Sequence, residues 1–249
     1  MSSRQPGPAA SDTVDSSGLS VAPREGTTAP FLVFGYGSLI WRPPPHVARR
    51  VPGYITTHYR RFWQLSEDHR GTVERPGRVV TLVPKSRYHS IAASLSSLSP
   101  SIAALSGPSP GEVTGAAKEK CWGVVYEIHP TSVEEVKAYL TVREMNGYSC
   151  LSLPVHTTGG VLLSSVYIGT LDNPQFSATS DDGDGLMRVA KHIKGAAGPS
   201  GPNEEYLLNL GTALAAIQAE VAAEDTDLHA DGRCGDWYVE ELIRLVKSM

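Results

Sequence analysis

Short apolar runs bounded by glycine, proline or polar residues make up most of the chain between residues 31 and 170. Runs of this length, rich in valine, isoleucine, tyrosine and threonine, are typical of β-strands. They predict six strands, at residues 31–34, 51–64, 78–83, 121–128, 151–156 and 161–170. The last two are joined by Thr-Thr-Gly-Gly, which is a hairpin signal, and we expect 78–83 and 121–128 to form a hairpin as well.

Helical spacing of apolar residues replaces the short runs in four other stretches. Residues 131–143 begin with capping residue types and acidic residues, and they place Val136 and Leu140 on one face. Further helices are predicted at residues 185–194, 204–217 and 236–247. Because most strands precede most helices, without the regular alternation of a doubly wound sheet, the order favours an α+β or small-barrel fold.

Two stretches lack the apolar residues that a folded core requires. Residues 1–30 are rich in serine, proline, glycine, alanine and threonine, and we expect a disordered tail there. Residues 85–120 have a similar composition and are expected to form a mobile, low-complexity insertion, since surface loops tolerate added length. Apart from that insertion, residues 31–249 are predicted to form a single domain.

Charge and composition narrow the class of protein. A net charge of -4 and a pI near 6.1 argue against nucleic-acid binding, and no apolar run approaches the length of a membrane span. The first 30 residues contain no apolar stretch typical of a secretory signal. Three cysteines are an odd number in no metal-binding spacing, and the histidines form no paired motif, so we expect a cytoplasmic protein without a metal site.

The apolar run that starts at Phe31 ends in a Gly-Tyr-Gly turn at residues 35–37. Two glycines so close together allow a turn with positive φ, and their N–H groups can converge on an anion such as a carboxylate. A dinucleotide fingerprint would need a third glycine at Ile40, and a nucleophile elbow would need one soon after Ser38. An ordinary glycine-rich hairpin turn is the alternative interpretation.

Glu144 lies where the helix predicted at residues 131–143 ends, just before the helix-stopping pair Asn146-Gly147. A carboxylate there faces the negative end of the helix dipole, which raises its pKa. Such a group is suited to exchanging protons with a substrate near neutral pH. The alternative is a solvated helix-end glutamate without a catalytic role.

Six sequence blocks in one order resemble the ChaC-type γ-glutamylcyclotransferases. They are FGYGSLIW at 34–41, RRFWQ at 60–64, DHRGT at 68–72, PGRVVTL at 76–82, YLTVRE at 139–144 and GPSGPNEEYL at 198–207. One departure is Thr141, where the family usually has asparagine. The resemblance implies a small mixed β-barrel flanked by helices, and cleavage of glutathione into 5-oxoproline and cysteinylglycine in the cytoplasm without a cofactor.

The resemblance also implies roles for individual residues. In this reaction the glutamyl α-amine attacks its own γ-carbonyl, so the site must hold the substrate folded while one group moves protons. Glu144 is predicted to be that general acid and base. Substrate contacts are predicted at Tyr36, Gly37, Ser38, Leu39, Arg78, Tyr148, Ser200, Asn203 and Tyr206.

Several alternatives stay open on the sequence. Arg78 fits a cross-strand salt bridge equally well, and Asn203 and Tyr206 fit a helix N-cap and a packed core residue. The same reaction could act on other γ-glutamyl-amino acids or on γ-glutamylamines. A non-catalytic module that binds γ-glutamyl peptides is a third interpretation, and the oligomeric state does not follow from the sequence.

Overall fold

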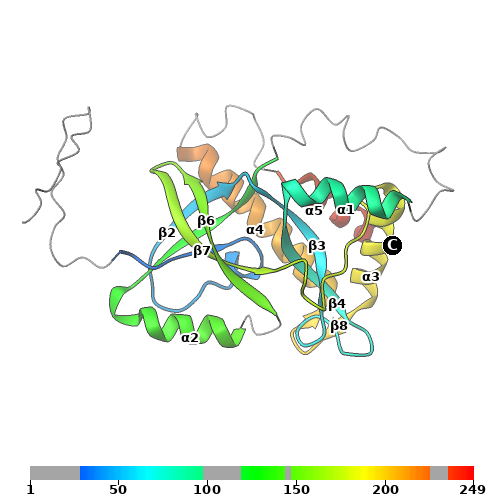
Figure 1. Ribbon diagram of the computed structural model, residues 1–249, viewed down its shortest axis with the longest axis horizontal. Helices are drawn as coiled ribbons and strands as arrows, with labels where there is room; N and C mark the ends of the chain where they lie inside the picture. Colours follow the sequence, from blue (N-terminus) through cyan, green and yellow to red (C-terminus); the bar gives the residue numbers. More distant parts are fainter. Residues whose placement is uncertain (1–28, 98–118, 144–146, 225–234) are drawn as a thin grey trace, which may run out of the picture.

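The computed structural model of the chain describes residues 29–97, 119–143, 147–224 and 235–249. Five strands close into a barrel in the order β1 (Leu32–Gly35), β5 (Cys121–Ile128), β2 (Val47–Ile55), β6 (Tyr148–Thr157) and β7 (Gly160–Gly169). Beside the barrel, β3 (His58–Ser66) and β4 (Gly77–Pro84) form a two-stranded antiparallel sheet (Figure 1). The barrel is mixed, because β1 and β7 run parallel while the other neighbours are antiparallel.

Helices flank both sheets, which confirms the predicted α+β class. They are α1 (Lys85–Ser97), α2 (Val133–Arg143), α3 (Gly183–Gly195), α4 (Asn203–Glu224) and α5 (Trp237–Lys247). Shorter elements are the 3-10 turns η1 (Ser38–Ile40) and η3 (Pro130–Ser132) and the paired strands β8 (Ala197–Gly198) and β9 (Gly201–Pro202). In Figure 1, α2 lies below the barrel, whereas α1, α3 and α5 gather on the side of β3 and β4.

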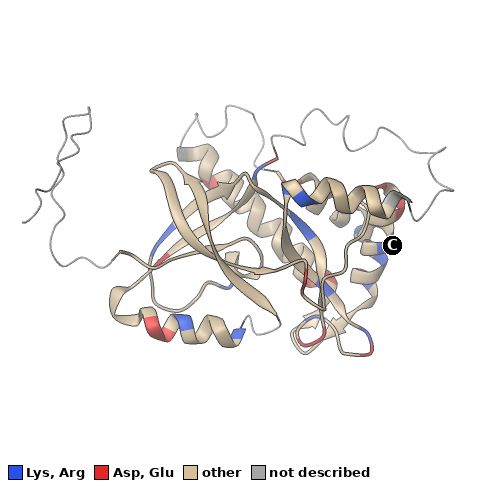
Figure 2. Cartoon of the chain, viewed as in Figure 1, with Lys and Arg blue, Asp and Glu red and all other residues tan. Residues whose placement is uncertain are grey.

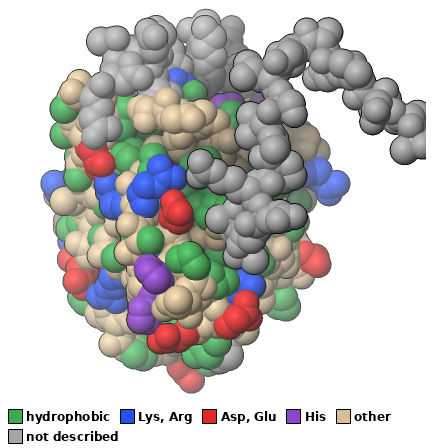
Figure 3. Space-filling view, turned by 90° about the vertical axis from the view of Figure 1, so that its left-hand side faces the viewer, with side chains coloured by type: hydrophobic (Ala, Val, Ile, Leu, Met, Phe, Trp, Pro, Cys, Tyr) green, Lys and Arg blue, Asp and Glu red, His purple; other side chains and the backbone are tan. Residues whose placement is uncertain are grey.

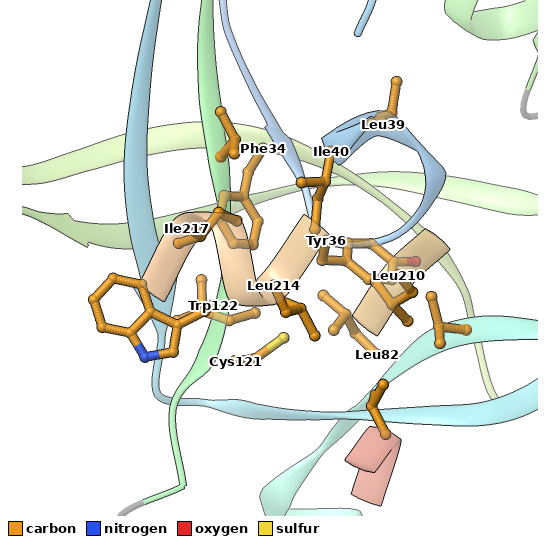
Figure 4. Close-up of a cluster of buried hydrophobic side chains, with 14 of the residues drawn as sticks. Phe34, Tyr36, Leu39, Ile40, Leu82, Cys121, Trp122, Leu210, Leu214 and Ile217 are labelled. Carbon is orange, nitrogen blue, oxygen red and sulfur yellow. The ribbon is translucent and has the colours of Figure 1, made fainter. Parts of the chain in front are cut away.

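Helix α4 supplies a large part of the core. Its buried apolar face consists of Leu207, Leu210, Leu214, Ile217 and Val221. Figure 4 shows Ile217 beside Phe34 of the barrel, and Leu210 and Leu214 turned toward Leu82 of β4. The length and apolar composition of α4 would also fit a membrane span, but its buried face accounts for that composition. One helix therefore joins the barrel and the small sheet in a single core.

The strand pairing differs from the expected hairpin between residues 78–83 and 121–128. β4 pairs with β3, whereas β5 pairs with β1 and β2 inside the barrel. The single strand predicted at 51–64 is in fact two strands, because the exposed pair Thr56-Thr57 separates β2 from β3. Apolar runs locate strands, but the partner of each strand depends on contacts that are distant in the sequence.

The predicted insertion at residues 85–120 begins with a helix rather than a loop. Tyr88 of α1 is buried, with its ring centroid 4.8 Å from that of Tyr59 and 5.7 Å from that of Trp63. Near the other end, Glu119 accepts a 3.2 Å hydrogen bond from Arg61 Nη1. Residues 98–118 of the insertion and 1–28 of the expected tail lie outside the described residues, so their disorder stays a prediction.

Two adjacent buried arginines in β3 anchor the helical side of the fold. Figure 2 shows this basic stretch in the middle of the strand. Arg60 Nη1 donates to Asp236 Oδ2 at 3.0 Å, and Arg61 Nε donates to Asp181 Oδ2 at 2.6 Å. Asp236 also caps α5 by accepting from the backbone N–H of Val239 at 3.2 Å. Because a buried charge without a partner is strongly destabilising, these pairs fix the start of α5 and the segment before α3 against β3.

Ion pairs on the barrel surface are more exposed. Arg49 Nε lies 2.9 Å from Glu127 Oε2 of β5, and Arg50 Nη1 lies 2.6 Å from Glu220 Oε2 of α4. The view onto the barrel end shows acidic, basic and apolar side chains interspersed (Figure 3). Exposed pairs of this kind contribute little individually to stability. The buried apolar core therefore contributes most of the stability.

Asn203 fastens the first turn of α4 to β4. Its side chain is fully buried; Oδ1 accepts from the backbone N–H of Arg78 at 2.7 Å, and Nδ2 donates to the backbone oxygen of Arg78, also at 2.7 Å. The amide side chain thus satisfies both backbone groups of Arg78, as a neighbouring strand would do. The start of α4 is fixed in register with β4.

We predict that Asn203→Ala lowers the free energy of unfolding by roughly 2–3 kcal/mol, because it leaves the buried backbone N–H and C=O of Arg78 unpaired. Urea denaturation followed by circular dichroism measures the change. The matched control is Asn209→Ala, the same substitution on the same helix at a half-buried position, where a much smaller effect is expected. Equal effects at the two positions would contradict the assigned role.

His192 of α3 is held in its neutral form. Nε2 donates to the backbone oxygen of Pro76 at 2.5 Å, while Nδ1 accepts from Arg78 Nε at 3.4 Å. Burial lowers the pKa of His192, and the nearby charges of Arg78 and Arg75 add to that effect against the opposing hydrogen bond to Pro76. Protonation would place a second positive charge against Arg78.

A group whose pKa is lowered on folding stabilises the protein above its unfolded pKa and loses that contribution as the pH falls. We therefore expect His192→Gln to show a smaller loss of unfolding free energy than the unsubstituted protein between pH 7.5 and pH 5.5. Urea denaturation at both pH values measures this difference. Identical pH dependence in the two proteins would show that His192 does not resist protonation.

Candidate active site

A cavity of about 490 Å³ lies where the barrel, the β3–β4 sheet and α2 meet. Its wall is built from segments far apart in the sequence, from the turn after β1 to the first turn of α4. Seven of the residues predicted to contact substrate line it, namely Tyr36, Gly37, Ser38, Leu39, Tyr148, Ser200 and Tyr206. The fold therefore gathers most of the predicted contacts around one space.

The turn after β1 depends on glycine because of close packing. A methyl group at Gly37 would lie 2.9 Å from both the Tyr206 hydroxyl oxygen and Val80 Cγ2. One at Gly35 would lie 2.7 Å from Leu39 Cβ. Neither glycine has a positive φ, so the expected left-handed turn is wrong. These positions require glycine for lack of space, since the turn is pressed against α4 and β4.

The turn η1 follows Gly37 directly, and its first amides have no hydrogen-bond acceptor among the described residues. The later N–H groups are used, because Ile40 donates to the Gly37 oxygen at 2.9 Å and Arg42 donates to the Ser38 oxygen at 2.8 Å. The first N–H groups of a helical turn have no carbonyl partner within that turn. Because Gly37, Ser38 and Leu39 all line the cavity, this end of η1 suits the predicted binding of a carboxylate.

Glu144, the predicted general acid and base, lies outside the described residues. Arg143, to which it is joined, ends α2 and lines the cavity. The Arg143 guanidinium donates to Ser38 Oγ at 3.0 Å and to the Arg42 backbone oxygen at 2.9 Å. Tyr148, four residues after Glu144, lines the cavity as well. The described residues on both sides of Glu144 therefore reach the cavity, and its role stays a prediction.

Arg78 and Asn203 do not line the cavity. The Arg78 Nη1 group donates to the backbone oxygens of Phe62 and Ser177, both at 2.9 Å, while Asn203 binds the Arg78 backbone. We therefore correct their predicted role: both residues stabilise the fold beneath the site, and the cross-strand salt bridge considered for Arg78 is also absent from its described contacts. Motif membership alone cannot separate a residue that supports a site from one that touches a ligand.

Several wall residues escaped the sequence reasoning. They are Trp41, Arg42, Leu65, Ser66, Asp68, His69, Arg70, Val79, Val80, Tyr139, Val142, Arg143, Tyr167 and Gln175. The block at residues 68–72 drew attention to its loop, but no spacing pattern pointed to Gln175. The described wall residues include three arginines but one carboxylate, that of Asp68. The described wall is therefore suited to an anionic ligand.

One end of the cavity is formed by two interlocking segments, the β3–β4 loop and the β8–β9 hairpin. The Ser200 N–H donates to the His69 backbone oxygen at 2.8 Å. A methyl group at Gly198 would lie 2.5 Å from that same oxygen, so the segments approach at backbone distance. Arg70 Nη1 donates to the Pro202 oxygen at 2.9 Å and completes the junction.

Metal-binding side chains are not clustered in the part of the chain that the structure describes. There, no group of three or more histidine, cysteine, aspartate or glutamate side chains could hold a metal ion. The polar groups of the described wall are mainly guanidinium, hydroxyl, amide and backbone N–H groups. Such groups are suited to binding an organic anion.

Comparisons with known proteins identify relatives of this chain. The sequence model of the family described as ChaC-like protein matches residues 31–231. A glutathione-specific gamma-glutamylcyclotransferase of Schizosaccharomyces pombe is 39% identical over 202 residues, which are 79% of this chain and 87% of the relative. A protein of the same name from Saccharomyces cerevisiae is 38% identical over 239 residues, covering 87% and 95% of the two chains.

A solved structure is also similar to this chain. A crystal structure of a yeast gamma-glutamyl cyclotransferase specific to glutathione has a TM-score of 0.69 and 35% identity to this chain. The match covers 89% of this chain and 97% of the yeast chain. With the family match extending through the barrel, the glycine turn and the first turn of α4, the chain belongs to the ChaC-like protein family.

Proposed function

We propose that this protein is a glutathione-specific γ-glutamylcyclotransferase that converts glutathione into 5-oxoproline and cysteinylglycine. The observation that carries the proposal is that one cavity gathers seven of the nine predicted substrate contacts in a ChaC-like chain. Two relatives with that activity in their names are 38% and 39% identical to it. The cavity volume of about 490 Å³ lies within the range typical of small-molecule sites.

The described charges of the wall match such a substrate. Glutathione carries two carboxylates and one ammonium group near neutral pH. Arg42, Arg70 and Arg143 line the cavity, with Asp68 as the single acidic side chain among the described wall residues. In the proposal, the glutamyl α-carboxylate lies against the free amides at the start of η1. That placement holds the α-amine and the γ-carbonyl of the same glutamyl group near each other.

The reaction needs positioning more than a protein nucleophile. The α-amine nitrogen bonds to the γ-carbonyl carbon and closes the five-membered ring, and the bond to the cysteine nitrogen breaks. Well-oriented intramolecular reactions of this kind gain about 7–11 kcal/mol from placement alone. Proton transfer supplies the rest: Glu144 takes a proton from the attacking nitrogen and returns one to the leaving amine.

A product assay tests the function directly. Purified protein is incubated with glutathione and, separately, with γ-glutamyl-alanine, and 5-oxoproline is measured by mass spectrometry. We expect release from glutathione alone. Release from γ-glutamyl-alanine would show that the enzyme acts on other γ-glutamyl substrates. Binding of either compound without release of 5-oxoproline would favour a non-catalytic module. A cytoplasmic location stays a prediction.

The role of Glu144 predicts the effect of one substitution. Glu144→Gln keeps the shape of the side chain but removes its ability to exchange protons, so kcat for glutathione is expected to fall by about 10²–10⁴-fold with KM little changed. Steady-state kinetics measure both constants. The control is Glu134→Gln on α2, where the side chain is 86% exposed and full activity is expected. Unchanged kcat in Glu144→Gln would remove it from the mechanism.

The packing of the glycine turn predicts the effect of a second substitution. Gly37→Ala places a methyl group 2.9 Å from both the Tyr206 hydroxyl oxygen and Val80 Cγ2, so the turn must shift from its position in the cavity wall. We expect kcat/KM for glutathione to fall at least roughly 10-fold, since small misplacements of a reacting group are costly. Gly159→Ala is the matched control, because its new methyl group would meet nothing closer than 3.9 Å. Equal activity in the two variants would show that the turn does not position substrate.

A further inference from the structure

Arg70 is a buried arginine that lies at the cavity wall. Its side chain is only 3% exposed and lines the cavity. Nη1 donates to the Pro202 oxygen at 2.9 Å and to Glu205 Oε2 at 3.1 Å. Nε and Nη2 make no hydrogen bond to any residue that the structure describes. A guanidinium has five N–H groups, so those on Nε and Nη2 await an acceptor at the cavity wall.

The positive charge of Arg70 is only partly balanced by the described residues. Its one carboxylate partner, Glu205, has a side chain that is 50% exposed, so water screens that pair. Asp68, the acidic residue of the described wall, lies 3.3 Å from His69 Nε2 and is hydrogen-bonded to Ser66 Oγ at 3.4 Å. An anion in the cavity would complete the environment of Arg70.

The other two arginines of the wall are less suited to that task. Arg143 uses its guanidinium to hold Ser38 and the Arg42 backbone, and it is half-buried. The side chain of Arg42 is exposed. Among the three arginines of the described wall, Arg70 alone combines near-complete burial with donors that have no partner among the described residues. Desolvated, charge-assisted hydrogen bonds of this kind are the strong ones.

Tyr206 relates Arg70 to the glycine turn. The Arg70 guanidinium carbon lies 5.9 Å from the centroid of the Tyr206 ring, and the hydroxyl of that ring packs against Gly37. Arg70 thus lies beside the ring of the tyrosine whose hydroxyl borders the start of η1.

We propose that Arg70 is a specificity-determining residue that binds the glycine carboxylate of glutathione through Nε and Nη2. The inference rests on the proposed function, in which the η1 amides hold the glutamyl α-carboxylate. A side-on pair of N–H groups matches the two oxygens of a carboxylate. Because Pro202, Glu205 and the ring of Tyr206 hold the guanidinium in place, little freedom is lost when the carboxylate binds.

The test compares glutathione with glutathione glycine amide, which has the same size and the same reacting atoms but no terminal carboxylate. We expect the unsubstituted enzyme to prefer glutathione by at least 10-fold in kcat/KM. In Arg70→Met the value for glutathione falls by at least 10-fold through KM, the value for the amide changes little, and the preference disappears. Arg70→Lys keeps the charge without the paired donors and falls between the two. Equal loss on both substrates would make Arg70 merely structural.

Glu205→Gln serves as the control, since its amide oxygen can still accept the hydrogen bond from Arg70 Nη1 while the negative charge is removed; the preference for glutathione should survive. If Arg70→Met does not fold, Arg70→Lys still tests the role of Arg70. The comparison of the two substrates with the unsubstituted enzyme tests it as well, because equal kcat/KM values for acid and amide overturn the proposal.

Failure of the proposed function has a different signature. An enzyme that releases no 5-oxoproline from any substrate is titrated calorimetrically with the intact acid and the amide. Tighter binding of the acid, lost in Arg70→Met and reduced in Arg70→Lys, supports the role of Arg70 even then. Equal binding of the two compounds overturns it.

Discussion

The packing of α4 between the barrel and the β3–β4 sheet is the constraint on which the site depends. Its apolar face joins the two sheets in one core, and Asn203 fixes its first turn on the backbone of β4. Tyr206, three residues further along, is thereby placed against Gly37 on one side and Arg70 on the other. The position of the cavity wall follows from how this one helix is anchored.

Buried arginines in this fold have two distinct uses. Arg60 and Arg61 pair with the carboxylates of Asp236 and Asp181 and thereby hold helices and loops together. Their positive charges are paired with carboxylates of the protein itself, as burial of a charge requires. Arg70 is buried to a similar degree but keeps donors at the cavity wall. Position at the cavity wall, rather than burial alone, separates an arginine available to a ligand from a structural one.

A reaction that closes a ring within its own substrate makes particular demands on the fold. The protein must supply shape, anchoring points for charged groups and one proton carrier, and these can come from distant segments. The cavity reflects this, because its described wall combines a turn after β1, a loop after β3, the end of α2 and the start of α4. Close backbone approaches, as between Gly198 and His69, hold these distant segments against one another.

The sequence by itself determined the local elements, the glycine turn and the family, because hydrophobic periodicity and short motifs are properties of neighbouring residues. Only the tertiary structure decided that β4 pairs with β3, that Gly37 is required for space, and that Arg78 and Asn203 support the site without lining it. These properties depend on which distant side chains meet. A polar residue in a motif acquires its role from its partners, and those partners are chosen by long-range packing.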